Sequence, residues 1–120
     1  MYTYSFEKLD VWKESIKLAI NTYKMTKSLP KEEKFGLISQ MRRCSVSISS
    51  NIAEGTARLT SKDKAHFMTI AYSSTLELIN QAIISKELSF ISNDEYLNLR
   101  KETESITNKI NALRNHFLNT

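Results

Sequence analysis

Residues 45–59 read Ser-Val-Ser-Ile-Ser-Ser-Asn-Ile-Ala-Glu-Gly-Thr-Ala-Arg-Leu, and they form the one segment whose periodicity is ambiguous. Polar and apolar residues alternate from Ser45 to Ser49, as they do in a half-buried strand. A lone short strand in an otherwise helical chain would leave its backbone groups without hydrogen-bond partners. We therefore predict a helix, in which small serine side chains permit a neighbour to approach closely. Gly55 provides a natural stop for this helix.

The composition of the whole chain also favours long helices. Two glycines and one proline in 120 residues leave little material for the tight turns of a sandwich or barrel. The length suits one domain with a single hydrophobic core. The single cysteine, Cys44, excludes an internal disulfide and points to a reducing compartment.

The beginning of the chain gives no sign of export or of membrane insertion. It reads Met-Tyr-Thr-Tyr-Ser-Phe-Glu-Lys, without the apolar run of a signal peptide. No segment comes near the ~18 uncharged apolar residues of a membrane-spanning helix. We therefore expect a cytoplasmic protein that does not enter a membrane.

Helical periodicity divides the chain into four segments separated by three short breaks. Pro30 ends the first segment, while Thr60 and Ser92 begin the third and fourth, each followed three positions later by an acidic residue as in a capping box. Short connections between amphipathic helices predict an all-α fold, an antiparallel up-down-up-down four-helix bundle. The expected helices of this single domain, residues 1–120, cover about residues 6–28, 31–54, 61–91 and 93–118.

The first expected helix carries two apolar stripes. The stripe expected to face the core contains Leu9, Trp12, Ile16, Ala19 and Tyr23. The other stripe repeats at heptad spacing on nearly the opposite face and contains Val11, Leu18 and Met25. Because a bundle helix needs only one apolar stripe, the second is a candidate contact between subunits. The alternative is that these side chains are merely exposed.

The last two expected helices differ in how widely they are apolar. The third is apolar over most of its circumference between Phe67 and Ile83, so it is either central or covered on a second side by another subunit. The fourth follows a strict heptad, which predicts coiled-coil-like packing. Its heptad residues are Tyr96, Leu99, Thr103, Ile106, Ile110, Leu113 and Phe117.

Positive charge is concentrated in the first half of the chain. The net charge is +4, and residues 1–64 carry 12 Lys/Arg against 7 Asp/Glu, whereas residues 65–120 carry 5 against 6. Spaced cations of this kind suit a phosphate backbone. The candidate nucleic-acid-binding residues are Lys13, Lys17, Lys24, Arg42, Arg43, Arg58, Lys62 and Lys64, with Lys27 on the same arc of the first helix. The alternative is an ordinary solvated surface, and no aromatic platform for base stacking is evident.

A second group of candidates consists of polar residues in apolar surroundings. Asn51, Glu54 and Glu77 belong to this group, and together with Gly55 they are assigned structural roles. Glu54 is expected to pair with Arg42, Arg43 or Arg58 of its own or another subunit, since an unpaired buried carboxylate is costly.

The sequence contains no complete metal or nucleophile site. A di-iron bundle requires two Glu-x-x-His motifs and two further glutamates, whereas this chain has one Asp63-x-x-His66. No Gly-rich phosphate loop is present, and Cys44 has no evident base partner. We therefore expect no enzymatic activity, no cofactor and no metal. The alternative is a metal-dependent enzyme that uses Asp63, His66 and Glu77.

Several motifs resemble those of one bacterial family, and together they span nearly all of the chain. They are Phe6-x-x-Leu9-Asp10-Val11-Trp12, Leu29-Pro30-Lys31-Glu32-Glu33, Gly36-Leu37-Ile38-Ser39-Gln40-Met41-Arg42-Arg43, Ser47-Ile48-Ser49-Ser50-Asn51-Ile52-Ala53-Glu54-Gly55 and Ile70-Ala71-Tyr72-Ser73-Ser74-Thr75-Leu76-Glu77. The chain thereby resembles the 23S rRNA-intervening-sequence proteins, small four-helix bundles whose molecular function is not established. It is also similar to the accessory protein of diversity-generating retroelements, a basic, barrel-like homopentamer that binds nucleic acid and a reverse transcriptase.

Two hypotheses about function follow from the charge pattern and the resemblance. The first is a non-enzymatic, homo-oligomeric helical bundle that binds RNA or DNA through phosphate contacts. The resemblance implies a homopentamer. The second is a protein-interaction scaffold that assembles through its apolar faces, binds a protein partner and does not bind nucleic acid.

Overall fold

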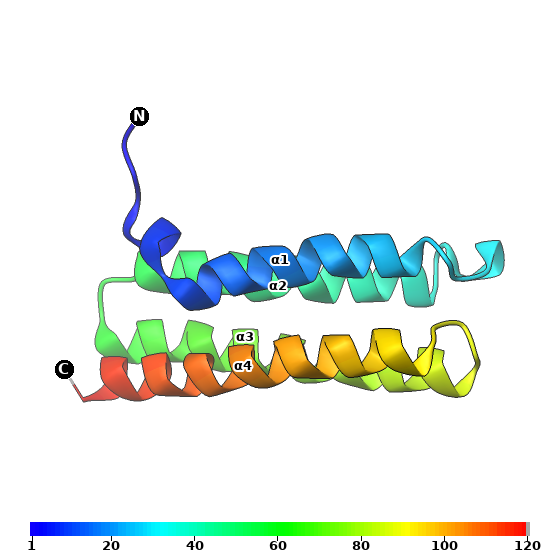
Figure 1. Cartoon of the computed structure of the whole chain (residues 1–120). Coiled ribbons are helices and arrows are strands. Elements are labelled where there is room, and N and C mark those ends of the chain that lie inside the picture. Colours follow the sequence, from blue (N-terminus) through cyan, green and yellow to red (C-terminus); the bar gives the residue numbers. More distant parts are fainter. Residues whose placement is uncertain (120) are drawn as a thin grey trace.

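The computed structural model describes residues 1–119, and these form four long helices. The helices are α1 (Asp10–Thr26), α2 (Leu37–Thr56), α3 (Ser61–Glu87) and α4 (Asn93–Leu118), with two short 3-10 helices, η1 (Ser5–Lys8) and η2 (Lys31–Glu33). Consecutive long helices run in opposite directions, and α1 and α2 form a layer above α3 and α4 (Figure 1). The predicted all-α bundle is confirmed, and residues 45–56 are helical rather than extended.

A continuous apolar core runs along the bundle axis. Its fully buried large side chains come from all four helices, and the largest of them are Leu18, Met41, Ile48, Ile52, Met68, Leu78, Ile106 and Ile110. The heptad predicted for α4 supplies the buried residues Tyr96, Leu99, Thr103, Ile106 and Ile110, as expected. Burial of apolar surface, which contributes about 25 cal/mol for each Å² removed from water, is the main term that stabilises such a bundle.

The structure confirms only part of the core face predicted for α1: Leu9 and Trp12 pack partly buried against the core, as expected. Val11 and Leu18 are only 5% and 0% exposed and belong to the monomer's own core, so they do not form the surface stripe that the sequence predicts. Met25 packs partly buried against the same core. Tyr23, which was predicted to lie in the core, is 43% exposed, and the neighbouring Ile20 is 50% exposed.

Three buried hydroxyl residues explain why Val11 and Leu18 lie in the core. Ser15, Thr22 and Thr26 fill the other core positions of α1, and each donates its hydroxyl to the carbonyl four residues earlier, at 2.8, 2.7 and 2.8 Å. Because the helix satisfies these donors itself, burying them costs little. The prediction gave core positions on this helix to apolar residues only, and it therefore placed Val11 and Leu18 on the surface.

The second helix begins later than predicted and ends differently. Residues 31–33 form η2 rather than a first helical turn, and α2 starts at Leu37, whose N–H is accepted by Glu33 Oε1 at 3.2 Å. Gly55 lies inside α2, which continues to Thr56. Gly55 is therefore not a stop signal. A Cβ placed there would lie 2.8 Å from Phe67 Cβ, so glycine is needed for the close approach of α3.

The third helix ends at Glu87 rather than at residue 91. Ser89 adopts a left-handed backbone conformation with φ of 62°. Its N–H donates to Lys86 O at 2.9 Å, and the next N–H, from Phe90, donates to Ser85 O at 2.8 Å. These two bonds are those of a Schellman motif, which usually has glycine in place of the serine. The predicted capping box of α4 is confirmed, because Ser92 and Glu95 exchange both hydrogen bonds.

Polar contacts, rather than apolar packing alone, connect α1 to α4. The Glu14 carboxylate accepts a hydrogen bond from Ser105 Oγ at 2.6 Å and forms an ion pair with Lys109. About two helical turns further along α1, Asn21 Nδ2 donates to both carboxylate oxygens of Glu102, at 3.2 and 3.1 Å. Beyond this second contact the two helices border a pocket.

Candidate nucleic-acid interface

The structure separates the predicted basic residues into two groups. Lys24, Arg42 and Arg43 lie where α1 ends and α2 begins, whereas Arg58, Lys62 and Lys64 lie at the opposite end of a bundle that is 45 Å long. Arg43 and Arg58 are about 22 Å apart along the helix axis at 1.5 Å per residue. The eight candidate residues therefore do not form one continuous patch. Lys13 and Lys17 are exposed along α1 between the two groups.

The cations at the α2–α3 turn already have partners within the chain. The Arg58 guanidinium lies 4.0 Å from the Asp63 carboxylate and 5.1 Å from the centre of the Phe67 ring. Lys64 Nζ donates to Thr56 O at 3.0 Å. These contacts fasten the turn to its helices. A structural role is thus sufficient to explain Arg58 and Lys64.

The other end of the bundle concentrates more positive charge than the sequence suggested. We call it the α1–α2 basic end, and it comprises Lys24, Lys27, Lys31, Lys34, Arg42 and Arg43. Lys31 and Lys34 were missed because residues 31–36 were expected to be the first turns of a helix. The segment instead folds around η2 and places both lysines beside Arg42 around one hollow in the surface.

Two exposed aromatic side chains lie among these cations. Phe35 is 88% exposed and Tyr23 is partly exposed. Both border a shallow hollow of about 630 Å³ whose lining residues are Tyr23, Lys34, Phe35, Ile38, Ser39, Arg42, Arg43, Val46 and Ser47. The sequence showed no stacking platform because Tyr23 was assigned to the core and Phe35 to a helix.

Arg42 is held in a fixed position at the edge of this hollow. Its Nε donates to Thr26 Oγ1 at 2.9 Å, and its guanidinium carbon lies 4.7 Å from the centre of the Tyr23 ring. A guanidinium over an aromatic face is stabilised by about 0.5–1 kcal/mol at an exposed site. Arg42 therefore presents a pre-positioned cation, whereas Arg43 is exposed and reaches solvent.

Of the three polar residues predicted to lie in apolar surroundings, Asn51 and Glu77 form side-chain hydrogen bonds within the chain, whereas Glu54 forms no ion pair with an arginine of the described residues. Asn51 Nδ2 donates to Ser47 O at 2.8 Å and to Ser47 Oγ at 3.0 Å. Glu54 is exposed, and within residues 1–119 it has no arginine partner, so its predicted ion pair is absent from the monomer. Glu77 Oε2 accepts a hydrogen bond from Cys44 Sγ at 3.3 Å.

Cys44 belongs to the core of the bundle. It is buried between α2 and α3, where Gln81 Nε2 donates to its sulfur at 3.5 Å. Burial, together with the hydrogen bond to the Glu77 carboxylate, raises the pKa of the Cys44 thiol to about 11. The thiolate form needed for nucleophilic chemistry is therefore disfavoured.

The residues of the metal-enzyme hypothesis lie apart. Asp63 pairs with Arg58 at the start of α3, and His66 and Glu77 are separated by about 17 Å along the same helix. Within residues 1–119 there is no group of three or more His, Cys, Asp or Glu side chains placed to hold a metal ion. The arrangement supplies no ligand set at these positions.

The described part of the chain also lacks a helix that is both long and apolar enough to cross a membrane. Comparison with known proteins then gives the family. The model of the 23S rRNA-intervening sequence protein family matches residues 7–112. The chain belongs to this family. The family resemblance inferred from the motifs is thereby confirmed.

A solved structure of a protein from the S23 ribosomal protein family has the same fold. It is a protein of unknown function from the S23 ribosomal protein family of Bacteroides thetaiotaomicron, and it superposes with a TM-score of 0.78 at 19% identity. The match covers 87% of this chain and 97% of that one. No functionally curated protein matches the chain. The likeness supports the helical bundle, and no activity is known for the relative.

Proposed function

We propose that this family member is a non-enzymatic, homo-oligomeric bundle that binds RNA or DNA through phosphates at its α1–α2 basic end. One observation carries the proposal: Lys34, Arg42 and Arg43 line one hollow together with the exposed rings of Tyr23 and Phe35. The other cations of the α1–α2 basic end line neighbouring hollows. Each phosphate that a Lys or Arg neutralises releases condensed counterions and strengthens binding. The opposite end offers fewer free cations, because Arg58 and Lys64 have partners within the chain.

The exposed rings favour a single strand over a duplex as the bound form. Unpaired bases can stack on an aromatic face, whereas paired bases are already stacked within the helix. Phe35 projects at the turn before α2, and Tyr23 lies beside it on the same hollow. Cations for the phosphates and rings for the bases are thus adjacent, as they are in single-strand binding proteins.

The apolar surface available for self-association lies on α3, outside the hollow that Tyr23 and Phe35 border. It consists of the exposed side chains of Leu76, Ile83 and Ile84. Burying such side chains against other copies would remove apolar area from water. The subunit number in this proposal, five, comes from family resemblance, and mass measurement by sedimentation in the binding buffer tests it.

A salt series with charge variants tests the phosphate contacts. The variant Lys31→Gln, Lys34→Gln, Arg43→Gln is compared with a matched control, Lys8→Gln, Lys62→Gln, Lys101→Gln, which removes the same charge elsewhere. If all three basic-end residues contact phosphates, the slope of log affinity against log salt decreases in magnitude by about 2 for a single strand. Equal slopes for the two variants, or no binding by the unaltered protein, would remove the basic end from the proposal.

The variant Phe35→Ala tests the role of the ring separately. Because Phe35 is exposed, the change leaves the core intact. Loss of one stacked base is expected to weaken single-strand binding about tenfold, since stacking contributes about 1–3 kcal/mol per base. Binding to a duplex of the same sequence should not change. An equal loss for both polymers, or no loss for either, would argue against stacking.

The alternative function is a protein-interaction scaffold, which the exposed apolar residues Leu76 and Ile83 favour. Affinity purification with and without nuclease distinguishes the two functions. A stoichiometric protein partner that survives nuclease treatment and is lost in Leu76→Asp supports the scaffold. A partner that disappears with the nucleic acid supports the phosphate-binding proposal.

A further inference from the structure

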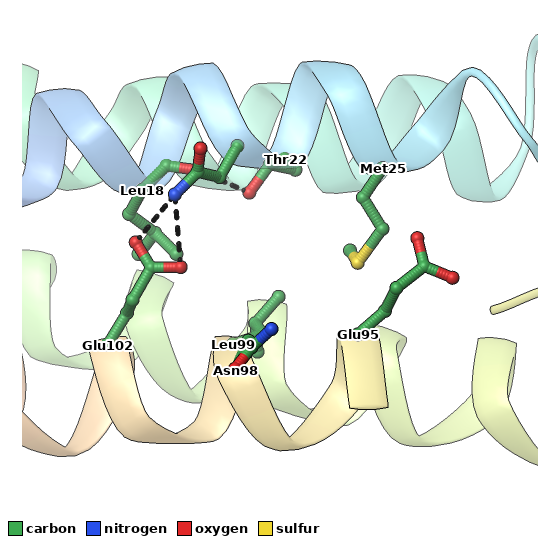
Figure 2. Close-up of a pocket in the computed structure, with 8 residues that line it drawn as sticks. Leu18, Thr22, Met25, Glu95, Asn98, Leu99 and Glu102 are labelled. Carbon is green, nitrogen blue, oxygen red and sulfur yellow. Dashed lines mark hydrogen bonds between the residues drawn. The ribbon is translucent and has the colours of Figure 1, made fainter. Parts of the chain in front are cut away.

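A pocket of about 280 Å³ lies between α1 and α4, away from the basic end. Its lining residues are Leu18, Asn21, Thr22 and Met25 of α1, and Glu95, Asn98, Leu99 and Glu102 of α4. Figure 2 shows Glu95 and Glu102 projecting from α4 toward α1, with Asn98 between them. The volume is close to that of sites for small organic molecules.

No Lys or Arg of the described chain forms an ion pair with Glu102 in this pocket. Glu102 is half-buried, and its carboxylate is held only by the neutral amide of Asn21, with no Lys or Arg of the described chain within ion-pair distance. Burial raises the pKa of Glu102, although the Asn21 hydrogen bond and the more distant Lys17 oppose the rise. A second positive group in contact with this carboxylate would therefore be stabilising.

Glu95 leaves an acceptor available at the other end of the pocket. One of its oxygens accepts the Ser92 N–H at 2.9 Å, as the capping box requires. The other oxygen accepts no hydrogen bond from the residues that the structure describes. Because Glu95 and Glu102 are separated by two helical turns, the two acceptors lie about 10 Å apart along α4.

Between the two carboxylates the pocket is lined by Asn98 and Met25, and its base is apolar. Leu18 and Leu99 are almost fully buried at its base, and Met25 projects toward Glu95 (Figure 2). Thr22 contributes no free donor, since its hydroxyl donates to Leu18 O. An anion would find two carboxylates and no cation here, so an anionic ligand is excluded on charge.

We propose that the α1–α4 pocket binds an alkylammonium ligand, specifically a short aliphatic diamine. Its two ammonium groups would each contact one carboxylate, of Glu95 and Glu102, and its methylene chain would lie against Met25, above the buried Leu18 and Leu99. The same chemistry is carried by a lysine side chain of a second copy of this protein, which is the other source of the group. This proposal is independent of nucleic-acid binding.

The test is a titration of isotopically labelled protein with 1,4-diaminobutane, followed by NMR in the absence of nucleic acid. The side-chain amide signals of Asn21 and Asn98 report directly on the pocket. We expect them to shift with the diamine and to remain in place with 1,4-butanediol, which has the same shape and no charge. Glu102→Gln should weaken binding about tenfold, as expected for a charged hydrogen bond.

A control variant and a measurement of self-association distinguish the possible outcomes. Glu104→Gln removes the same charge from the exposed face of α4 and should leave the affinity unchanged. If the diamine does not bind but Glu102→Gln alone abolishes self-association by sedimentation, a lysine of a second copy supplies the ammonium group. Equal shifts with the diol, equal weakening in both variants, or no response of either binding or assembly to Glu102→Gln would overturn the proposal.

Discussion

Gly55 shows how one residue controls the distance between two helices. It lies in the last turn of α2, and a Cβ there would lie 2.6 Å from Met68 Cε and 2.8 Å from Phe67 Cβ. The methionine methyl group can move, but a Cβ atom is fixed to the backbone of α3. The close approach of α2 and α3 therefore depends on the absence of a side chain at this position.

We expect Gly55→Ala to lower the free energy of unfolding by about 1–3 kcal/mol, because overpacking would push α3 away. This loss exceeds the roughly 1 kcal/mol that alanine gains from helix propensity. Urea denaturation at constant protein concentration measures the change. Ser50→Ala, at an exposed position of the same helix, is the control and should alter stability by less than about 0.5 kcal/mol. A stabilised Gly55→Ala variant would contradict the packing argument.

Cys44 gives a second prediction at the residue scale. With a pKa of about 11, set by burial and by Glu77, only roughly one thiol in a thousand is ionised at pH 8. We expect the folded protein to react with Ellman's reagent at least about a hundredfold more slowly than the urea-unfolded protein. Glu77→Gln should accelerate labelling only modestly, since burial remains. Rapid labelling of the folded protein would show that α2 and α3 open readily.

At the scale of elements, α3 ends on a residue poorly suited to its conformation. Ser89 occupies the left-handed position of a Schellman motif at φ of 62°, where glycine is free of strain. We expect Ser89→Gly to raise the free energy of unfolding by about 0.5–1 kcal/mol. Thermal unfolding measures the gain, and Ser73→Gly, in the middle of the same helix, should instead destabilise by about 1 kcal/mol. A loss of stability in Ser89→Gly would contradict the strain argument.

The same residue explains a limit of the sequence prediction. Periodicity identified four helices, and the capping residues Thr60 and Ser92 placed the starts of α3 and α4 correctly. No glycine marked the end of α3, so that helix was extended too far. The periodicity of apolar residues also misplaced Val11 and Leu18 of α1 on the surface. Hydroxyl residues such as Thr22 can share the buried face with them, because they donate a hydrogen bond to a carbonyl of their own helix.

The candidate sites depended on information that periodicity does not contain. The basic end was only partly predicted, since Lys31, Lys34 and Phe35 come together through a turn rather than along a helix face. The α1–α4 pocket was not predicted at all. The sequence assigned Glu95 only to a capping box and gave Glu102 no role, and only the packing of α1 against α4 places them in a pocket.

At the scale of the whole molecule, two carboxylates on the α1–α4 contact respond to pH in opposite directions. Burial opposes ionisation of Glu14, but the hydrogen bonds from Lys109 and Ser105 outweigh it and lower its pKa. Glu14 therefore stabilises the fold above its ordinary pKa of 4.5, and the contribution is lost as pH falls through the folded value. For Glu102, burial raises the pKa, so its stabilising contribution is greatest at low pH and is lost as pH rises through the folded value.

Two variants separate these effects. At pH 7, Glu14→Gln should lower the melting temperature, because it removes the ion pair that joins α1 to α4. Glu102→Gln should keep or raise it, because glutamine still accepts from Asn21 without placing a charge in the pocket. Below pH 4.5 both differences should shrink as the native carboxyl groups become protonated. If Glu102→Gln instead lowered the melting temperature at pH 7 by as much as Glu14→Gln, the Glu102 charge would already be compensated, and the pocket would have no need of a positive ligand.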